Sequence, residues 1–215
     1  MKVLVTGGSG VLGRAALPLL QAEGHDVDTP SRSELDLFDT VAVGRAVANV
    51  AAVLHLATRI PHGHVGAPDE WRENDRLRAE ASVVLVDAGL AAEMETYVQP
   101  SVAFLYPKGI AADEDAPLAD VPDHLRSALL AEKQAARFAA AGRRGVTLRL
   151  GLLDGPGTAY PKPDERYGAT LHVDDAGRAL ALALGVPSGV YNVCRDGERA
   201  SNERFKGVSG WRPTK

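Results

Sequence analysis

TGGSGVLG, residues 6–13, is the stretch that decides the fold. It separates the β-branched run KVLVT from VLGRAALPLLQAEG, whose apolar residues have helical spacing. Gly7, Gly10 and Gly13 recur at every third position, and a diphosphate can approach backbone N–H groups closely only where no Cβ intervenes. A glycine turn needed only for close packing of strand against helix is the alternative. The strand–turn–helix context favours the phosphate site.

The composition is that of an ordinary globular protein, with 45% apolar and 24% charged residues among 215. The net charge of −4 argues against nucleic-acid binding, which needs clustered Lys and Arg. No apolar run approaches the roughly 20 residues that span a bilayer, and the start MKVLVTGGSG lacks the apolar core of a signal peptide. The single cysteine, Cys194, fits a reducing compartment. We therefore expect a cytoplasmic protein without membrane or nucleic-acid partners.

Strand-like and helix-like segments alternate along the whole chain. Strands are expected at 2–6, 25–29, 51–58, 96–106, 145–153 and 189–193, and helices at 11–24, 40–50, 69–94, 123–142 and 173–184. Such alternation predicts an α/β protein with a Rossmann-type, doubly wound parallel sheet that is covered by helices on both faces.

Several motifs occur in the order of one enzyme family. TGGSGVLG resembles the T-G-x-x-G-x-x-G signature of short-chain dehydrogenases/reductases, specifically the extended, NAD-dependent epimerase/dehydratase branch. VLHLAT at 53–58 is similar to the V-I-H-L-A-A strand of that branch, and LRLGLLDGPG at 148–157 to its L-R-x-x-x-x-Y-G-P-G motif. LHVDDAGRALALAL at 171–184 resembles H-V-D-D-x-A-x-A. The resemblance covers nearly the whole chain.

The resemblance implies one NAD(P)-binding Rossmann domain over residues 1–215 and a small-molecule substrate. Relatives carry a few tens of residues between G-P-G and H-V-D-D, whereas here the interval is only TAYPKPDERYGAT. A shortened substrate lobe would therefore come from about 152–170 and 188–215, and its pocket would be shallow or completed by another subunit. The apolar faces of the helices around 70–91 and 125–141 are expected to pair two copies as a homodimer.

The end of the second strand predicts which cofactor is bound. An acidic residue there would bind both ribose hydroxyls and repel a 2′-phosphate. Counted from Gly24, that position falls on Ser31, which Arg32 follows, and a hydroxyl with a guanidinium suits a phosphate. NADP(H) is therefore favoured over NAD(H). In the rival interpretation Asp28 binds the ribose and Arg32 stacks on adenine.

The resemblance also implies further cofactor contacts. Asp36 would bind the adenine amino group, unless it only caps a helix. Asn74 stands where the family has an asparagine that opens the fourth helix. The complete set of expected cofactor-binding residues is Gly7, Ser9, Gly10, Val11, Leu12, Gly13, Ser31, Arg32, Asp36, Leu37, Leu56, Ala57, Thr58, Asn74 and Lys133.

The catalytic pattern departs from the family, whose chemistry uses Ser/Thr, Tyr and Lys. Alignment of AEKQAARF puts the lysine at Lys133 and replaces the tyrosine by Leu129. Alignment of QPSVAFLY puts Ser101 at the first serine and replaces the second, usually catalytic one by Val102. Leucine cannot exchange a proton, so the ordinary acid–base step fails there. Lys133 is expected to keep its bond to the nicotinamide ribose, unless it is a solvated surface charge.

The remaining catalytic candidates are substitutes for the missing groups. Ser101 would orient the substrate oxygen, or else bond the backbone at its strand end. Tyr106 aligns with a family tyrosine that is usually structural, and it could serve as a replacement acid. Tyr160 lies in a loop and is a weaker choice.

The histidines do not predict a metal site. The six show no metal-ligand spacing, and the pair His62 and His64 is expected to be solvent-exposed. His55 lies in a buried strand and is expected to pack or to bond the backbone. By resemblance, His172 belongs to the H-V-D-D motif, in which Asp174 would cap the next helix.

Three classes of function remain open. The first, which the order of motifs favours, is an atypical NAD(P)-dependent oxidoreductase or epimerase/dehydratase-like enzyme acting on a small polar substrate. The second is a non-redox cyclase or isomerase on the same scaffold, motivated by the loss of the Tyr and Ser positions. The third is a catalytically inert NADPH-binding sensor or interaction protein. Fold alone does not choose among them.

Overall fold

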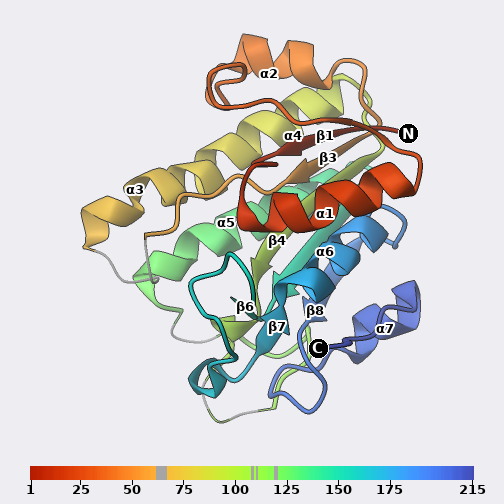
Figure 1. Ribbon diagram of the computed structural model, residues 1–215. Coiled ribbons are helices and arrows are strands. Elements are labelled where there is room, and N and C mark those ends of the chain that lie inside the picture. The colour runs from red at the N-terminus through yellow and green to blue at the C-terminus, as the bar shows by residue number, and fades with distance from the viewer. Residues whose placement is uncertain (62–66, 108, 110, 119–120) are drawn as a thin grey trace.

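Six parallel strands form the central sheet of the computed structural model, which describes residues 1–61, 67–107, 109, 111–118 and 121–215. The predicted exposed pair, His62 and His64, lies outside these residues. The strand order is β2-β1-β3-β4-β5-β8 (Figure 1), and the strands are β1 (Lys2–Thr6), β2 (Asp26–Asp28), β3 (Ala52–His55), β4 (Thr96–Val102), β5 (Arg144–Leu150) and β8 (Gly189–Val193). This confirms the Rossmann-type fold that the alternating pattern predicts.

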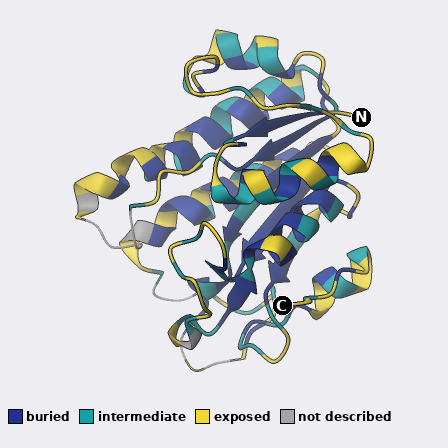
Figure 2. Cartoon of the chain, viewed as in Figure 1, coloured by how far each residue is buried: buried dark blue, intermediate teal, exposed yellow. Residues whose placement is uncertain are grey.

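The helices cover both faces of the sheet (Figure 1). They are α1 (Val11–Ala22), α6 (Val173–Leu182) and α7 (Glu203–Ser209) on one side, and α2 (Thr40–Val47), α4 (Ser82–Ala91) and α5 (Arg126–Ala140) on the other. Alternate residues of β1 belong to opposite cores: Val3 and Val5 pack toward α1, and Leu4 packs toward α2 and α4. Figure 2 shows the central strands β3, β4 and β5 mostly buried, as a parallel sheet between two helix layers requires, whereas the edge strand β2 is largely exposed.

The position of β1 between β2 and β3 determines where a ligand can bind. The connection that leaves β1 crosses one face of the sheet through α1 to β2, and the connection that leaves β3 crosses the other face through α4 to β4. Val3 is in register with Val27 on β2, and Val5 with Leu54 on β3. At such a switch point the two connecting segments diverge, and a crevice opens beyond the C-terminal ends of the strands. The glycine turn at 7–10 lies at this edge.

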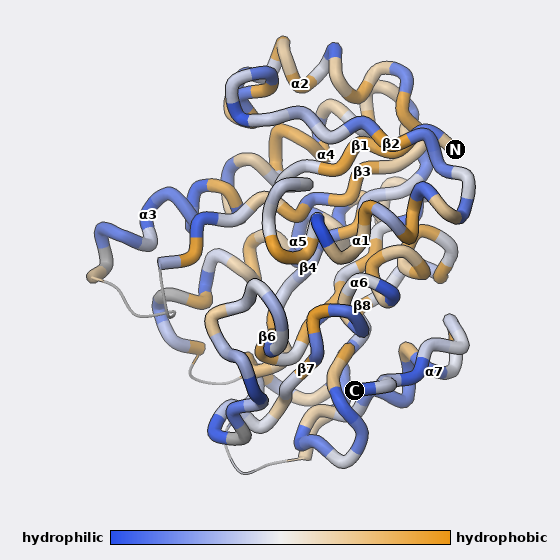
Figure 3. Tube along the Cα trace, viewed as in Figure 1, coloured by the Kyte–Doolittle hydropathy of each residue, from blue (hydrophilic) through white to orange (hydrophobic). Residues whose placement is uncertain are grey.

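The helix expected at 69–94 is divided into three parts. It begins as α3 (Pro68–Arg76), continues through one turn of π-helix, η2 (Leu77–Ala81), and ends as α4. Figure 3 shows that α3 is mostly hydrophilic, in agreement with the polar first part of the sequence segment. The π-turn widens the helix by one residue, and it is the feature that the apolar pattern does not predict. No described helix is both long and apolar enough to cross a membrane.

Segments that follow β4, β5 and β8 form a small lobe below the sheet (Figure 1), whereas α6 and β8 themselves belong to the main body. Strands β6 (Leu152–Asp154) and β7 (Thr170–His172) pair in parallel, and Ala112 bridges to Ala200. Ala103, Cys194 and Ala200 contribute to a separate apolar cluster in this lobe, and the single cysteine is buried there.

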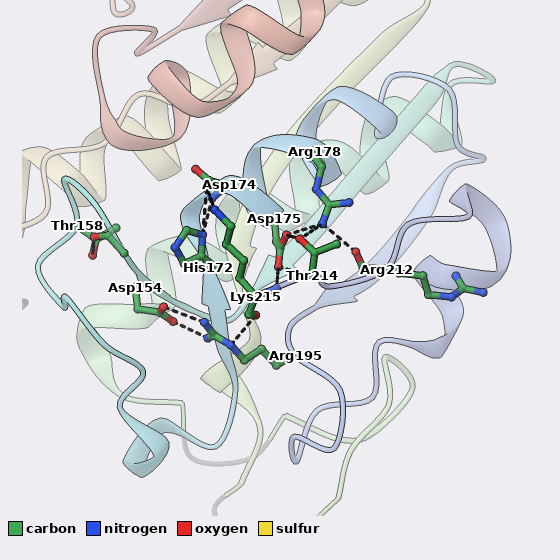
Figure 4. A network of polar contacts seen from close by, with 11 residues as sticks. Asp154, Thr158, His172, Asp174, Asp175, Arg178, Arg195, Arg212, Thr214 and Lys215 are labelled. Atoms are coloured by element: carbon green, nitrogen blue, oxygen red, sulfur yellow. Dashed lines mark hydrogen bonds and ion pairs between the residues drawn. The ribbon is translucent and has the colours of Figure 1, made fainter.

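Polar contacts tie the last residues of the chain to the start of α6 (Figure 4). The buried carboxylate of Asp175 accepts hydrogen bonds from the backbone N–H groups of Thr214 (2.9 Å) and Lys215 (3.1 Å), and from the Arg178 guanidinium. The helix cap differs from expectation, because His172 Nδ1 accepts from the N–H of Asp174 at 3.2 Å. The expected cap, Asp174, instead contacts Lys215, since it lies inside the first turn.

Candidate dinucleotide and substrate site

Two adjoining cavities open at the C-terminal edge of the sheet. The first, of about 430 Å³, lies against the glycine turn and the residues that follow β2. The second, of about 520 Å³, extends from α1 toward β4, β5 and the small lobe. Both are lined by Gly10, Leu56, Ala57, Thr58 and Arg59, so an extended molecule can occupy one and reach into the other.

The glycine turn has the geometry of a phosphate cradle. Gly7 has a φ of +74°, and a Cβ there would come within 2.6 Å of the Ala57 nitrogen. A Cβ on Gly13 would lie 2.3 Å from the Gly8 carbonyl oxygen, so Gly13 allows α1 to approach the turn. Gly10 precedes α1, and no side chain caps the helix. The first amide groups of α1 are therefore available to an anion, and the turn fits the diphosphate of a dinucleotide.

The first cavity contains the residues expected around the adenosine. Ser31, Arg32, Asp36 and Leu37 all line it, whereas Asp28 is not among the lining residues of the described chain. Asp36 Oδ1 accepts from the N–H of Phe38 at 2.9 Å. It does not cap a helix, because Asp39 caps α2 by accepting from the N–H groups of the first turn.

At this end of the cavity, arginines from the loops after β2 and β3 pair with one carboxylate of α3. Arg32 Nη1 lies 3.0 Å from Glu73 Oε1, and Arg59 Nε lies 3.8 Å from Glu73 Oε2. The backbone N–H of Ser31 donates to Glu34 Oε2 at 2.8 Å, which shapes the loop after β2. The side chains in all three contacts are exposed, so a phosphate could rearrange them.

Most of the other expected cofactor residues lie at the junction of the cavities. Ser9 lines the first cavity, Val11 and Leu12 line the second, and Leu56, Ala57 and Thr58 line both. Asn74 lines neither; its buried Oδ1 accepts from the N–H of Arg59 at 3.2 Å and positions the loop after β3. Gly13 also lines neither cavity, and its role is to let α1 pack closely against the glycine turn.

Lys133 lies away from both cavities. It is exposed on α5, whereas Leu125, just before that helix, lines the second cavity. Lys133 lies eight positions after Leu125, which corresponds to roughly 12 Å along the helix axis. The interior side of α5 carries Ala128, Ala131 and Glu132. The structure therefore does not bring Lys133 together with the other expected cofactor residues, and its ribose contact stays a prediction that this geometry does not favour.

Ser101 and Tyr106 belong to one buried polar network. The Ser101 hydroxyl donates to Glu132 Oε1 at 2.5 Å, and Arg149 binds the same carboxylate through Nη2 at 2.7 Å. Arg149 Nη1 also donates to the Tyr106 hydroxyl at 2.8 Å, which in turn donates to Asn192 Oδ1 at 2.8 Å. These bonds connect β4, α5, β5 and β8. Ser101 lines the second cavity, but its proton is directed at Glu132.

The hydroxyl of Tyr106 is not placed for acid–base catalysis. It lines neither cavity, and both hydrogen-bonding directions of its oxygen are used inside the network. Burial raises its pKa, and nearby Arg149 offsets only part of the effect. The geometry therefore agrees with the structural role that is usual at this position.

A second phenol, which the sequence analysis did not single out, does reach the second cavity. Tyr167 lines it, edge-on to Phe104, and its hydroxyl lies 3.3 Å from that of Tyr160. The contact with Tyr167 is the main reason that the pKa of Tyr160 rises to about 12. Both tyrosines lie in the loop 157–168, where no periodic pattern of apolar residues predicts which way a side chain points.

The second cavity is mostly apolar and contains one deeply buried cation. Its lining includes the side chains of Ile60, Pro61, Trp71, Val102, Phe104, Leu125, Leu150, Leu152 and Leu153. Arg78, on η2, lines it with only 7% of its surface exposed. Burial lowers the pKa of Arg78 to about 10, so the guanidinium remains charged at neutral pH. The sequence analysis missed this residue.

His55 is held neutral at the bottom of the site. It is 2% exposed, and burial lowers its pKa to about 4. Its Nε2 lies 3.0 Å from the carbonyl oxygen of Leu77 and its Nδ1 lies 2.7 Å from Thr6 Oγ1. Because a carbonyl only accepts, Nε2 carries the proton and Nδ1 accepts from the hydroxyl. His55 thus bonds the backbone, as its buried strand predicts, and joins β1 and β3 to η2.

Residues 3–171 match the model of the "NAD dependent epimerase/dehydratase family". The chain belongs to this family. A curated relative, the "3-diazoavenalumate denitrifying reductase" of a Streptomyces species, is 34% identical over an alignment of 232 positions, which covers 91% of this chain and 76% of that protein. This confirms the resemblance seen in the motifs.

Solved structures agree with the fold. UDP-glucose 4-epimerase of Thermus thermophilus, in complex with NAD, has a TM-score of 0.80 at 20% identity. UDP-glucuronic acid 4-epimerase of Bacillus cereus, also in complex with NAD, has a TM-score of 0.81 at 15% identity. Each alignment covers all of this chain and 94% of the other. At these identities the likeness concerns architecture, and the chemistry has to be argued from the site.

Proposed function

We propose that this family member is an NAD(P)H-dependent reductase whose acceptor needs no proton from the protein. The observation that carries the proposal is the second cavity, which adjoins the glycine turn yet contains neither of the expected acid–base groups in a working position. Leu129 stands at the expected tyrosine position, and the Ser101 hydroxyl is directed at Glu132. The curated reductase relative supports reduction over epimerisation.

The relative's name describes a reductase that removes nitrogen from a diazo carboxylate, and this chemistry suits such a cavity. A carbonyl that accepts a hydride becomes an alkoxide and must be protonated, which is the role of the family tyrosine. When bound, NAD(P)H would supply a hydride to a diazonium ion R–N₂⁺, giving R–H, N₂ and NAD(P)⁺ in balance. No proton is transferred, so this reaction does not need the family tyrosine that Leu129 replaces.

The chain's own residues would hold the reactants together and exclude water. The glycine turn binds the diphosphate at the start of α1. Thr58 and Ala57 line both cavities, and they are therefore adjacent to any group that passes between them. Apolar side chains such as Phe104, Leu125 and Leu153 surround the acceptor and keep competing water out. A largely apolar acceptor fits this lining better than the polar one expected from the sequence.

The test is a reduction assay with a carboxylated arenediazonium salt and NADPH. We expect enzyme-dependent loss of the nicotinamide absorbance together with equimolar N₂ and arene. NADPH that carries deuterium at the transferable position should place deuterium in the arene. Cofactor binding without turnover above the enzyme-free control would favour the inert-sensor alternative, and product formation without oxidised cofactor would favour a non-redox enzyme.

We further propose that NADP(H) is preferred over NAD(H), because Ser31 and Arg32 line the first cavity and Asp28 does not. Replacing Arg32 by Ala should weaken NADPH binding about tenfold to hundredfold and leave NADH binding nearly unchanged, since only NADPH offers the 2′-phosphate. Replacing Glu73 by Gln should strengthen NADPH binding, because that carboxylate competes for Arg32. Calorimetric titration with both cofactors checks this. Equal losses for NADPH and NADH would contradict it.

The cytoplasm is the location that we propose for this reductase. Its single cysteine is free and buried, and burial raises the pKa of that thiol to about 12. Such a cysteine needs no oxidising compartment.

A further inference from the structure

Arg78 has no partner for its charge among the described residues. Its Nη1 is buried without a hydrogen bond, and no ion pair joins its guanidinium to a described carboxylate. Asp75, three residues earlier, is the acid whose charge acts most on Arg78, and it only partly offsets the effect of burial on the pKa. A buried guanidinium without a directly bonded carboxylate is costly, so a feature of this kind calls for a ligand.

The other cations near the site are already paired. Arg149 is bound to Glu132 through two nitrogens, and Arg59 is exposed and lies near Glu73. Among the described side chains that line the second cavity, Arg78 is thus the charged group that is both buried and unpaired. An anion entering this cavity would meet Arg78.

The π-turn explains how an arginine comes to line an apolar cavity. Arg78 lies on η2, whose wider turn changes the direction of the side chains relative to α3 and α4. Two contacts hold this turn: His55 Nε2 donates to the Leu77 carbonyl oxygen, and the Ser82 hydroxyl donates to the Arg78 carbonyl oxygen at 2.6 Å. The backbone that carries Arg78 is therefore held in place, which lowers part of the entropic cost of binding an anion.

The other side chains of the second cavity indicate what kind of molecular skeleton carries the anionic group. Trp71, Phe104 and Tyr167 contribute aromatic rings, and Leu125 and Val102 contribute aliphatic surface. Flat rings and apolar walls suit a planar hydrocarbon skeleton. A volume of about 520 Å³ is that of a small-molecule site, although part of it is shared with the first cavity.

We propose that Arg78 binds the carboxylate of the substrate and that the substrate class is a planar, largely apolar monocarboxylate. The proposal rests on the assignment of the second cavity as the substrate site of a reductase. A carboxylate matches the fork of N–H donors on a guanidinium and neutralises its charge. The hydroxyls of a cofactor ribose, the other groups that Arg78 could reach, would leave that charge uncompensated.

The experiment measures binding, so that it does not depend on turnover. 2-Naphthoate and its neutral counterpart 2-naphthamide are titrated by calorimetry into protein saturated with NADP⁺. The wild-type protein should bind the acid at least about tenfold more tightly than the amide. Arg78→Gln should abolish this preference by weakening naphthoate alone, and Arg78→Lys should retain part of it. Arg72→Gln, which removes an exposed arginine from α3, serves as the matched control and should behave as wild type.

Three results would overturn the proposal. The first is a wild-type protein that does not prefer the acid, including one that binds neither probe. The second is an Arg78→Gln variant, shown to be folded by thermal melting, that keeps the preference. The third is loss of NADP⁺ affinity in Arg78→Gln, which would assign Arg78 to the cofactor. An intact, Arg78-dependent preference without diazonium reduction would leave this proposal standing and reject the proposed reaction.

Discussion

Lys133 shows how single residues are placed by their register on a helix. The buried side of α5 follows Ala128, Ala131 and Ala135, at the spacing of one helical face, and Lys133 falls between these positions. Alignment of the short motif AEKQAARF points to α5. Because Leu129 replaces the tyrosine of that motif, the motif no longer determines which side chains of α5 face the site. The apolar periodicity of the same segment carries that information, because it predicts which side chains turn outward.

Arg78 gives the opposite lesson. It lies three residues before Ala81 and seven before Leu85, on the buried side of its helix, so the sequence places a cation where the pattern calls for an apolar residue. Such a mismatch between local pattern and burial is typical of a functional position. What the sequence cannot reveal is the absence of a partner, since that depends on side chains from β3, β4 and α5 that meet only in the folded chain.

His55 makes stability depend on pH. Its pKa lies at 6.5 in an ordinary environment and at about 4 in the folded protein, where burial disfavours the charged ring. Between these values the unfolded chain binds a proton that the folded chain does not, so stability falls as the pH drops from 6.5 toward 4. The loss should reach about 3 kcal/mol. Urea unfolding across this range checks it.

The control for this prediction is His55→Gln, which cannot take up the proton. Its free energy of unfolding is expected to be lower near neutral pH, because the bonds to Thr6 and Leu77 change. Its slope against pH between 6.5 and 4 should nevertheless be shallower than that of the wild type. Identical slopes would show that other groups cause the pH dependence.

At the scale of secondary-structure elements, the parallel sheet was predictable for a physical reason. Each central strand is buried on both faces and each connection is a helix, so apolar runs and amphipathic segments alternate visibly in the sequence. The π-turn at 77–81 was not predictable, because one extra residue in a helix hardly changes a pattern of mixed charged and small residues. Its position is settled by a tertiary bond from His55 and a local bond from Ser82.

The turn between β1 and α1 is the element on which cofactor binding depends. Gly10→Val should abolish dinucleotide binding, because the new side chain would extend into the space that both cavities share. The protein should still fold, since a Cβ at this position meets only the Gly7 carbonyl oxygen, at 3.1 Å. Calorimetry with NADPH measures the loss, and thermal melting checks the fold.

A valine at Gly44 is the matched control for the glycine turn. Gly44 lies on α2, and a Cβ there meets nothing within 4 Å. Gly44→Val carries the same change in backbone freedom and side-chain size, and should bind NADPH normally. Unchanged affinity in Gly10→Val would reject the cradle.

At the scale of the whole molecule, the short lobe forms one wall of the second cavity. The loop that contains Gly157, Thr158 and Ala159 lines the second cavity together with Tyr167, and β6 and β7 fix the two ends of the segment. The salt bridge from Arg195 to Asp154, at 2.8 Å, ties the segment after β8 to β6, and Asp175 on α6 anchors residues 214–215 (Figure 4). The lobe expected from motif spacing at about 152–170 and 188–215 stays a prediction, and residues 189–193 of it belong to the central sheet as β8. The size of the pocket depends on how the loop folds back.

The outer surface of α4 and α5 leads to the last prediction, which is that two copies pair in solution. These helices lie side by side on one face of the sheet (Figure 1), and Leu130 on α5 is 44% exposed. The exposed pair Arg137–Asp87 links the two helices on their outer side, where it would form the polar rim of an interface.

Sedimentation at micromolar concentration should give twice the chain mass of 22.7 kDa. Leu130→Asp should shift the protein toward the monomer, because an interface that buries this leucine would have to desolvate a carboxylate. Val208→Asp alters an aliphatic residue of similar exposure, 43%, on α7, and should leave the mass unchanged. A wild-type protein that sediments as a monomer would remove the pairing, and a dimer indifferent to Leu130→Asp would place its interface elsewhere.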